Sequence, residues 1–179
     1  MQRIFIALNH NEQRIAKWIA SERGKNKRQT GIQDKRWVDD KTSEQIDRQG
    51  EYGEFAFAKL MNLFPDFDTS RPDSGHDFKM PNGKTVDVKT TDGDLYPLQI
   101  ELTHNGRVDY FALMIGFPPD SDDFDGVYRY AGMIDAKSAM TEKYIKPIRD
   151  RMAYRIPQSD LFPLPEELWF MLPVIGIDG

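Results

Sequence analysis

A tight turn at residues 80–84, Met-Pro-Asn-Gly-Lys, constrains the fold of this chain more than any other feature. Pro at the first turn position, Asn at the second and Gly where φ must be positive are typical of a three-residue hairpin loop closed by a bulge. With Pro, Asn and Gly as the loop, counting back along both strands places Asp77 opposite Asp87. Directly opposed residues share a sheet face, with Cβ atoms about 4.5–5.5 Å apart. Two carboxylates so close repel each other, so the turn predicts a compensating charge beside them.

A divalent cation is the economical compensation, because Mg²⁺ is usually held by one or two carboxylates together with water and substrate phosphate. Lys89 lies two residues beyond Asp87, and strand alternation turns both to one face. Val86 and Val88 then point into the core. A lysine in this place can orient or deprotonate an attacking water while the metal polarises a phosphate. A two-residue loop would instead place Asp77 opposite Val88 and remove the site.

A long helix is expected over residues 42–64, ended by the proline that follows. Its apolar residues form one face at a 3.6-residue period. Glu54 sits at the rim of that face, whereas Glu51 lies farther round, so Glu54 is favoured as the acid that reaches the sheet. Gly50 and Gly53 each cost about 1 kcal/mol inside a helix relative to alanine. They are justified if backbone or substrate must pass close by.

Three short motifs follow one another along the chain: Gly-Glu-Tyr-Gly-Glu-Phe-Ala-Phe-Ala-Lys-Leu (50–60), Ser-Gly-His-Asp-Phe (74–78) and Thr-Val-Asp-Val-Lys-Thr-Thr (85–91). Together they resemble the PD-(D/E)XK nuclease superfamily, of restriction-endonuclease-like fold, over roughly residues 42–135. In that family a helical Glu precedes a hairpin carrying an Asp and then acid-x-Lys on an αβββαβ core. The carboxylates of the family bind Mg²⁺ for phosphodiester hydrolysis. The resemblance implies that these roles fall on Glu54, Asp77, Asp87 and Lys89, with the Val88 carbonyl as a further candidate ligand.

Two alternatives stay open for these residues. No proline precedes Asp77, and a literal Pro-Asp pair at residues 72–73 makes Asp73 the main rival for its role. Asp87 and Lys89 also fit an ordinary solvated strand face, where a surface ion pair is worth at most about 1 kcal/mol. The three histidines do not help to decide, because they show no paired spacing typical of zinc: His10, His76 and His104.

The remaining pattern predicts one compact α/β domain. A chain of 179 residues with 39% hydrophobic composition can close a core without disulfides. Further helices are expected over residues 11–22 and 136–146, and strands over 76–80, 85–90, 109–117 and 127–134. The order favours a mixed central sheet flanked by helices. Residues 1–41 are expected to be a basic, helical extension to a nuclease-like domain over residues 42–179.

The net charge of −5 is unevenly distributed. Residues 1–50 hold eleven Lys or Arg against seven Asp or Glu (+4), and residues 51–179 hold thirteen against twenty-two (−9). One stretch of the acidic part, residues 137–155, is basic. Its cations are Lys137, Lys143, Lys146, Arg149, Arg151 and Arg155. This stretch and the basic residues 23–28 suit either a solvated face or phosphate contacts.

The sequence therefore predicts a Mg²⁺- or Mn²⁺-dependent deoxyribonuclease, with an endonuclease favoured. The competing hypotheses are a nucleic-acid-binding or accessory protein that keeps the fold without cutting, and RNA as the substrate. A homodimer would suit a duplex with two strands to cut, but no interface is identifiable. Zero cysteines, the absence of an apolar run of about 20 residues and the lack of a secretory signal predict an intracellular, cytoplasmic protein without a membrane span.

Overall fold

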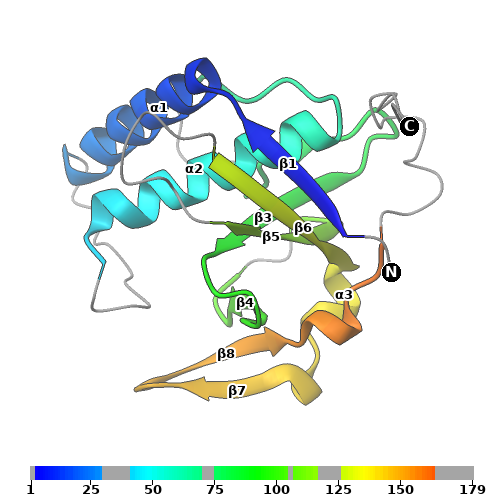
Figure 1. Cartoon of the computed structure of the whole chain (residues 1–179). Coiled ribbons are helices and arrows are strands. Elements are labelled where there is room, and N and C mark those ends of the chain that lie inside the picture. The colour runs from blue at the N-terminus through cyan, green and yellow to red at the C-terminus, as the bar shows by residue number, and fades with distance from the viewer. Residues whose placement is uncertain (1–2, 30–40, 70–74, 105–106, 117–125, 164–179) are drawn as a thin grey trace.

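The computed structural model describes residues 3–29, 41–69, 75–104, 107–116 and 126–163 (Figure 1). Its elements, in chain order, are β1 (Ile4–Leu8), α1 (His10–Gln29), α2 (Ser43–Leu60), β2 (Phe78–Lys79), β3 (Thr85–Thr91), β4 (Leu98–Glu101), β5 (Tyr110–Gly116), β6 (Gly126–Asp135), α3 (Ala136–Ala139), β7 (Ile145–Ile148) and β8 (Arg151–Ile156). Short 3₁₀ turns cover Glu142–Tyr144 and Gln158–Asp160. The architecture is mixed α/β, as the sequence predicted. Within the described residues, each helix is too short or too polar to span a bilayer.

The main sheet has five strands in the order β1-β6-β5-β3-β2. Strands β3 and β5 are parallel, and the other neighbours are antiparallel, so the predicted mixed sheet is confirmed. Strand β2 is short and pairs only with the start of β3, through Phe78 with Val86 and Lys79 with Thr85. Among the described residues, no strand pairs with β3 beyond Val86 on that side. The second half of β3 therefore forms an edge where side chains can gather.

Helices α1 and α2 cover one face of the main sheet (Figure 1). They enclose a core that includes Leu8, Ile19, Phe57, Val86 and Val88. Thr42 caps α2: its side chain accepts a hydrogen bond from the Gln45 backbone, and the Gln45 side chain accepts one from the Thr42 backbone. The cap fixes where α2 begins, and with it which turns of the helix lie over β3.

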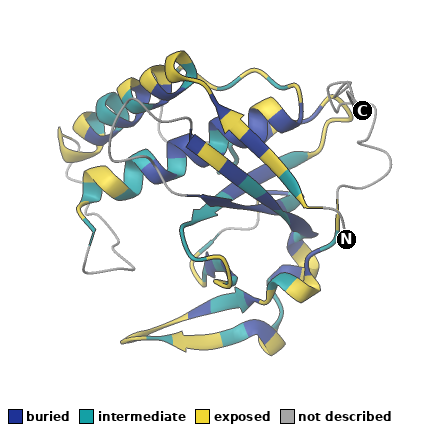
Figure 2. Cartoon of the chain, in the orientation of Figure 1, coloured by how far each residue is buried: buried dark blue, intermediate teal, exposed yellow. Residues whose placement is uncertain are grey.

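The opposite face of the main sheet is covered by a second, three-stranded sheet in the order β4-β8-β7. A second core lies between the two sheets and includes Leu98, Ile100, Phe111, Leu113 and Ile156. The centre of the main sheet is accordingly buried in Figure 2. The predicted flanking helices, α1 and α2, cover only one face, because the alternating apolar residues of β4 and β8 close the other face as a sheet.

Two regions depart from the predicted elements. The helix predicted over residues 136–146 ends at Ala139, and residues 145–148 instead form β7, the first strand of a hairpin with β8. Asp135 caps α3, but the isoleucines at 145 and 148 favour a strand because β8 offers a partner. The segment 1–41 contributes a strand as well as a helix, and β1 pairs with β6 in the main sheet.

Candidate active site

The turn between β2 and β3 has the geometry that the sequence predicted. The Met80 backbone N donates to the Lys84 carbonyl at 2.7 Å, and the Gly83 N donates to the Met80 carbonyl at 2.8 Å. Gly83 has a φ of +82°, a conformation that side chains other than glycine rarely adopt. The register pairs Phe78 with Val86, and the Asp77 backbone N donates to the Val86 carbonyl at 3.0 Å, so the regular pairing ends before Asp77. The expected ladder pair of Asp77 with Asp87 is not formed, although the charge of Asp87 acts on Asp77. The predicted three-residue loop is confirmed.

Asp77 and Asp87 are drawn together at the open edge of β3. The Oδ2 atom of Asp77 accepts a hydrogen bond from the Val88 backbone N at 2.6 Å, while the Asp87 side chain is only 8% exposed. Burial raises the pKa of Asp77 well above its ordinary value, and the neighbouring carboxylates of Glu54 and Asp87 raise it further. The Asp87 and Glu54 carboxylates thus favour the protonated form of Asp77 at this edge.

Asp87 has two cationic or hydrogen-bonding partners. Lys89 places Nζ 2.6 Å from Oδ1, and His104 places Nε2 3.2 Å from Oδ2. Burial opposes the charged form of Asp87, but the His104 hydrogen bond and the Lys89 ammonium outweigh it and hold its pKa below the ordinary value. For Lys89 burial lowers the pKa, and the carboxylates of Asp87 and Asp77 more than reverse this. Lys89 and Asp87 are therefore both charged.

His104 is the site residue that the sequence did not indicate. It follows β4, which belongs to the second sheet, and its ring packs edge-on against Phe111 of β5, with centroids 4.9 Å apart. Only the packing of one sheet on the other carries this histidine to Asp87. No local motif marks that long-range contact in the sequence.

Gly53 lets α2 approach β3 closely enough to present Glu54 to the site. A Cβ atom on Gly53 would lie 1.7 Å from the Oγ1 of Thr90, so any side chain there requires Thr90 to move. A Cβ on Gly50 would meet nothing within 4 Å. The expectation that these glycines permit a close approach is thus confirmed for Gly53 alone.

Glu54 and Glu51 share one partner, Arg23 of α1. The Arg23 Nη1 atom lies 2.9 Å from Glu51 Oε2 and 3.3 Å from Glu54 Oε2. Burial raises the pKa of Glu54 to about 8, and the Glu51 carboxylate adds to this rise. Burial also raises the pKa of Glu51 to about 7, although Arg23 opposes the rise. The charge of Lys89 lowers the pKa of Glu54, and the charge of Asp77 raises the pKa of Glu51.

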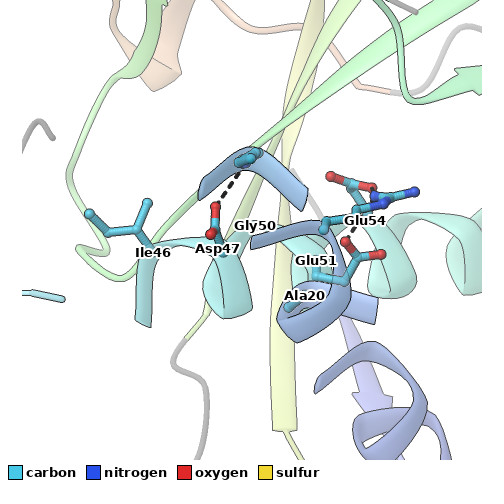
Figure 3. A pocket seen from close by; sticks show the side chains of 8 residues that line it. Ala20, Ile46, Asp47, Gly50, Glu51 and Glu54 are labelled. Carbon is cyan, nitrogen blue, oxygen red and sulfur yellow. Dashed lines mark hydrogen bonds and ion pairs between the residues drawn. The ribbon is translucent and has the colours of Figure 1, made fainter. Parts of the chain in front are cut away.

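The two glutamates and Arg23 line a pocket of about 150 Å³ between α1 and α2 (Figure 3). Asp47 lies one turn earlier on α2, and its Oδ1 atom is 2.9 Å from the Nζ of Lys27. Part of the basic segment 23–28 therefore faces acids of α2, which argues against the whole segment being a phosphate surface.

Four carboxyl groups, two of them with pKa values near or above neutrality, form a donor set suited to a hard divalent cation. Among the described residues, however, no three acidic or histidine side chains are spaced to hold a metal ion. Arg23 holds the α2 acids, and Lys89 with His104 holds Asp87. The donor chemistry fits Mg²⁺ or Mn²⁺, whereas closure around an ion requires side-chain movement.

The other candidate ligands are placed differently. Asp73, the rival of Asp77, lies outside the described residues. The Val88 carbonyl points to the same side of β3 as the Val88 N–H, because both groups of a strand residue face one neighbour. That side is the open edge where Asp77 lies. The carbonyl is thus aimed toward the carboxylate cluster.

The fold and site define a mixed α/β protein with a buried carboxylate and lysine cluster at the edge of its main sheet. The chain belongs to a family described as a family of unknown function, DUF5843, whose model matches residues 4–161. The match includes β1 through β8 and every site residue named above. No curated protein and no solved structure matches the chain.

Proposed function

We propose that this protein is a metal-dependent nuclease that hydrolyses phosphodiester bonds in DNA, with Mg²⁺ or Mn²⁺ as the cofactor and endonuclease action favoured. One observation carries the proposal: Asp77, Asp87 and Lys89 meet at the open edge of β3, and Glu54 of α2 interacts electrostatically with Lys89 and Asp77. Burying charges of one sign together is costly unless an ion or a substrate compensates them. Lys89, His104 and Arg23 offset only part of this cost, because the pKa values of Glu51, Glu54 and Asp77 stay raised.

Each residue has a role in this proposal. Asp77, Asp87 and Glu54 would hold the ion, with the Val88 carbonyl as a further ligand. When bound, the metal supplies charge stabilisation at the phosphate and a more acidic water. The attacking water forms the new P–O bond and releases a proton to solvent as the bond to the leaving oxygen breaks, and the leaving oxygen takes up a proton from solvent. The raised pKa of Lys89 supports a charged lysine that orients the water and donates to a phosphate oxygen, rather than one that removes a proton.

The order α2, β2, β3 and β5 supports a restriction-endonuclease-like core, because it follows the first four elements of αβββαβ. Strands β5 and β6 are antiparallel neighbours, so the described residues hold no counterpart of the second helix of that core between them, and residues 117–125 lie outside the described part of the chain. The insertion of β4 between β3 and β5 is a departure, and it is this insertion that brings His104 to the site.

A second candidate function is a DNA-binding or accessory protein that does not cut. It is favoured by the ion pairs of Arg23, which already compensate the two acids of α2. In that case Arg23 stands permanently in place of a metal, and added Mn²⁺ changes neither stability nor activity.

The two functions are separated by incubating the purified protein with linear and circular duplex DNA in Mg²⁺, in Mn²⁺ or in EDTA. We expect metal-dependent cleavage, and opening of the circle establishes an endonuclease. The matched control is Asp87→Asn, which keeps the size of the side chain but weakens its hold on a cation. Cleavage that persists in this variant would show that the activity belongs to another protein, and a structured RNA in a parallel reaction tests the alternative substrate.

A further inference from the structure

The β7–β8 hairpin carries a local positive charge in an acidic protein. Residues 143–155 contain five Lys or Arg and one acid, Asp150, which gives a net charge of +4 in a chain whose net charge is −5. The remainder of the chain therefore carries −9. Such a concentration of charge on one element is the electrostatic pattern of a nucleic-acid contact.

The strand pairing arranges these cations toward the tip of the hairpin. Lys146 pairs with Ala153 and Ile148 pairs with Arg151, so Lys146 and Arg151 share one face of the ribbon. Arg149 lies in the turn with a φ of +56°. All three cationic side chains are exposed. The partners on the other face of β8, Tyr154 and Ile156, pack toward the second core, so the cationic face points away from it.

The tip lies on the same side of the molecule as the candidate active site. Strand β4 pairs with β8 through Glu101 with Ala153, and the chain continues from Glu101 to His104, which contacts Asp87. Because the two strands are antiparallel, the tip of the hairpin extends past the end of β4 from which His104 follows. Figure 1 shows the tip projecting toward the side where β3 ends.

We propose that the β7–β8 hairpin is an arm that binds the phosphates of duplex DNA through Lys146, Arg149 and Arg151 and holds the duplex beside the carboxylate cluster. This inference rests on the proposed nuclease function for the identity of the ligand. A two-stranded ribbon fits the major groove of B-DNA, about 12 Å wide, whereas the deep, narrow major groove of A-form RNA excludes it. The arm supplies the positive charge that the acidic site lacks for holding a polyanion.

The test measures binding of a fluorescent DNA duplex by the full chain carrying Asp87→Asn, so that cleavage does not interfere, over a series of salt concentrations. The triple change Lys146→Gln, Arg149→Gln and Arg151→Gln is added to this parent. Each lost phosphate contact reduces the slope of log K against log salt by about 0.9, so we expect the slope to fall by about 2.7. The matched control neutralises three exposed cations elsewhere, Arg3, Arg14 and Lys79, and leaves the slope nearly unchanged.

Equal slopes for the hairpin variant and its parent would contradict the proposal that the hairpin binds DNA. Tighter binding of duplex RNA than of duplex DNA would contradict it as well. Neither result bears on cleavage, which is measured separately on the chain without Asp87→Asn. A hairpin-dependent slope with no cleavage in Mn²⁺ would instead support the arm and leave the non-cutting DNA-binding protein as the function. A thermal melt of the triple variant that matches its parent excludes unfolding as the cause of any change.

Discussion

Charged side chains are handled in opposite ways at the edge of β3 and on the β7–β8 hairpin. At the edge of β3 the carboxyl groups are buried beside one another, and their pKa values are displaced in both directions. On the hairpin the cations are exposed and spread along a ribbon. Burying like charges costs free energy of folding, so each buried acid at the edge of β3 is by itself an indication of function. Exposed charges cost little, so the cations of the β7–β8 hairpin indicate function only when they are considered together.

The largest effect should come from the residues that make the edge cluster unusual. Asp87→Ala and Lys89→Ala should each lower the rate of DNA cleavage by about 10²–10⁴-fold, because one removes a ligand and the other the cation at the phosphate. Lys79→Ala, which changes an exposed lysine of the same hairpin, is the matched control. Cleavage rates are measured in Mn²⁺, and thermal melts are recorded for the same variants. Near-normal cleavage by both site variants would contradict a catalytic role for the edge cluster.

The two acids of α2 should differ in their contribution. Glu54→Gln should lower cleavage by about 100-fold, because Glu54 is the acid that interacts with Lys89 and Asp77. Glu51→Gln should lower it by less than about tenfold, since Glu51 is chiefly paired with Arg23. Parallel kinetics on the two variants decide the assignment, and the reverse order would move the ligand role to Glu51.

His104 tests whether the second sheet contributes to the edge cluster. His104→Ala should lower the affinity of the site for Mn²⁺ by about 10–100-fold, because the loss of a group that orients a metal ligand typically has this effect. The expected signature is a higher Mn²⁺ concentration for half-maximal cleavage with a smaller change at saturating Mn²⁺. His10→Ala, on an exposed residue at the start of α1, should match the wild type. An equal loss at every Mn²⁺ concentration would contradict a positioning role.

The sequence predicted those parts of the site that local chemistry determines. The Pro-Asn-Gly turn specifies the register of Phe78 with Val86, and this register brings Asp77 beside β3, where the charge of Asp87 acts on it. The helical period likewise placed Glu54 at the rim of the apolar face of α2, where its carboxylate acts on Asp77. In each case the determining residues lie within a few positions of one another along the chain.

The parts that the sequence did not predict depend on contacts between distant segments. His104 reaches Asp87 only because β4 pairs with β8 and the second sheet packs on the first. Arg23 lies in a segment whose basic composition suggested a surface, but α1 turns it inward onto Glu51. The helix predicted over residues 136–146 is replaced in its second half by β7, because pairing with β8 outweighs the local helical propensity.

The glycines of α2 test the close approach on which the edge cluster depends. Gly53→Ala should destabilise the protein by about 1–3 kcal/mol, because the new methyl group overlaps Thr90. Gly50→Ala should stabilise it by about 1 kcal/mol, since that position is helical and open. Urea unfolding of the two variants gives both values. A similar loss of unfolding free energy in both variants would mean that the cost comes from the packing of α2 in general and not from the contact with Thr90.

The smallest effect is the pH dependence of stability, which depends on the edge cluster and not on the hairpin. Glu54 keeps its proton up to a pKa of about 8 in the folded chain, against an ordinary value of 4.5, so the folded state binds more protons within that window. Stability in EDTA should therefore fall as the pH rises from about 5 to about 8, by at least about 3 °C in Tm.

Glu54→Gln should flatten this pH dependence, because the amide has no proton to lose, whereas the hairpin triple variant should retain it. A bound cation replaces the proton as the compensating charge, so Mn²⁺ should raise the Tm of the wild type more at about pH 8 than at about pH 5. Differential scanning fluorimetry across this range, with and without Mn²⁺, measures both effects. A Tm that rises steadily with pH in EDTA would show that the α2 acids are ionised and fully compensated by Arg23, and that the edge cluster has no need of a metal.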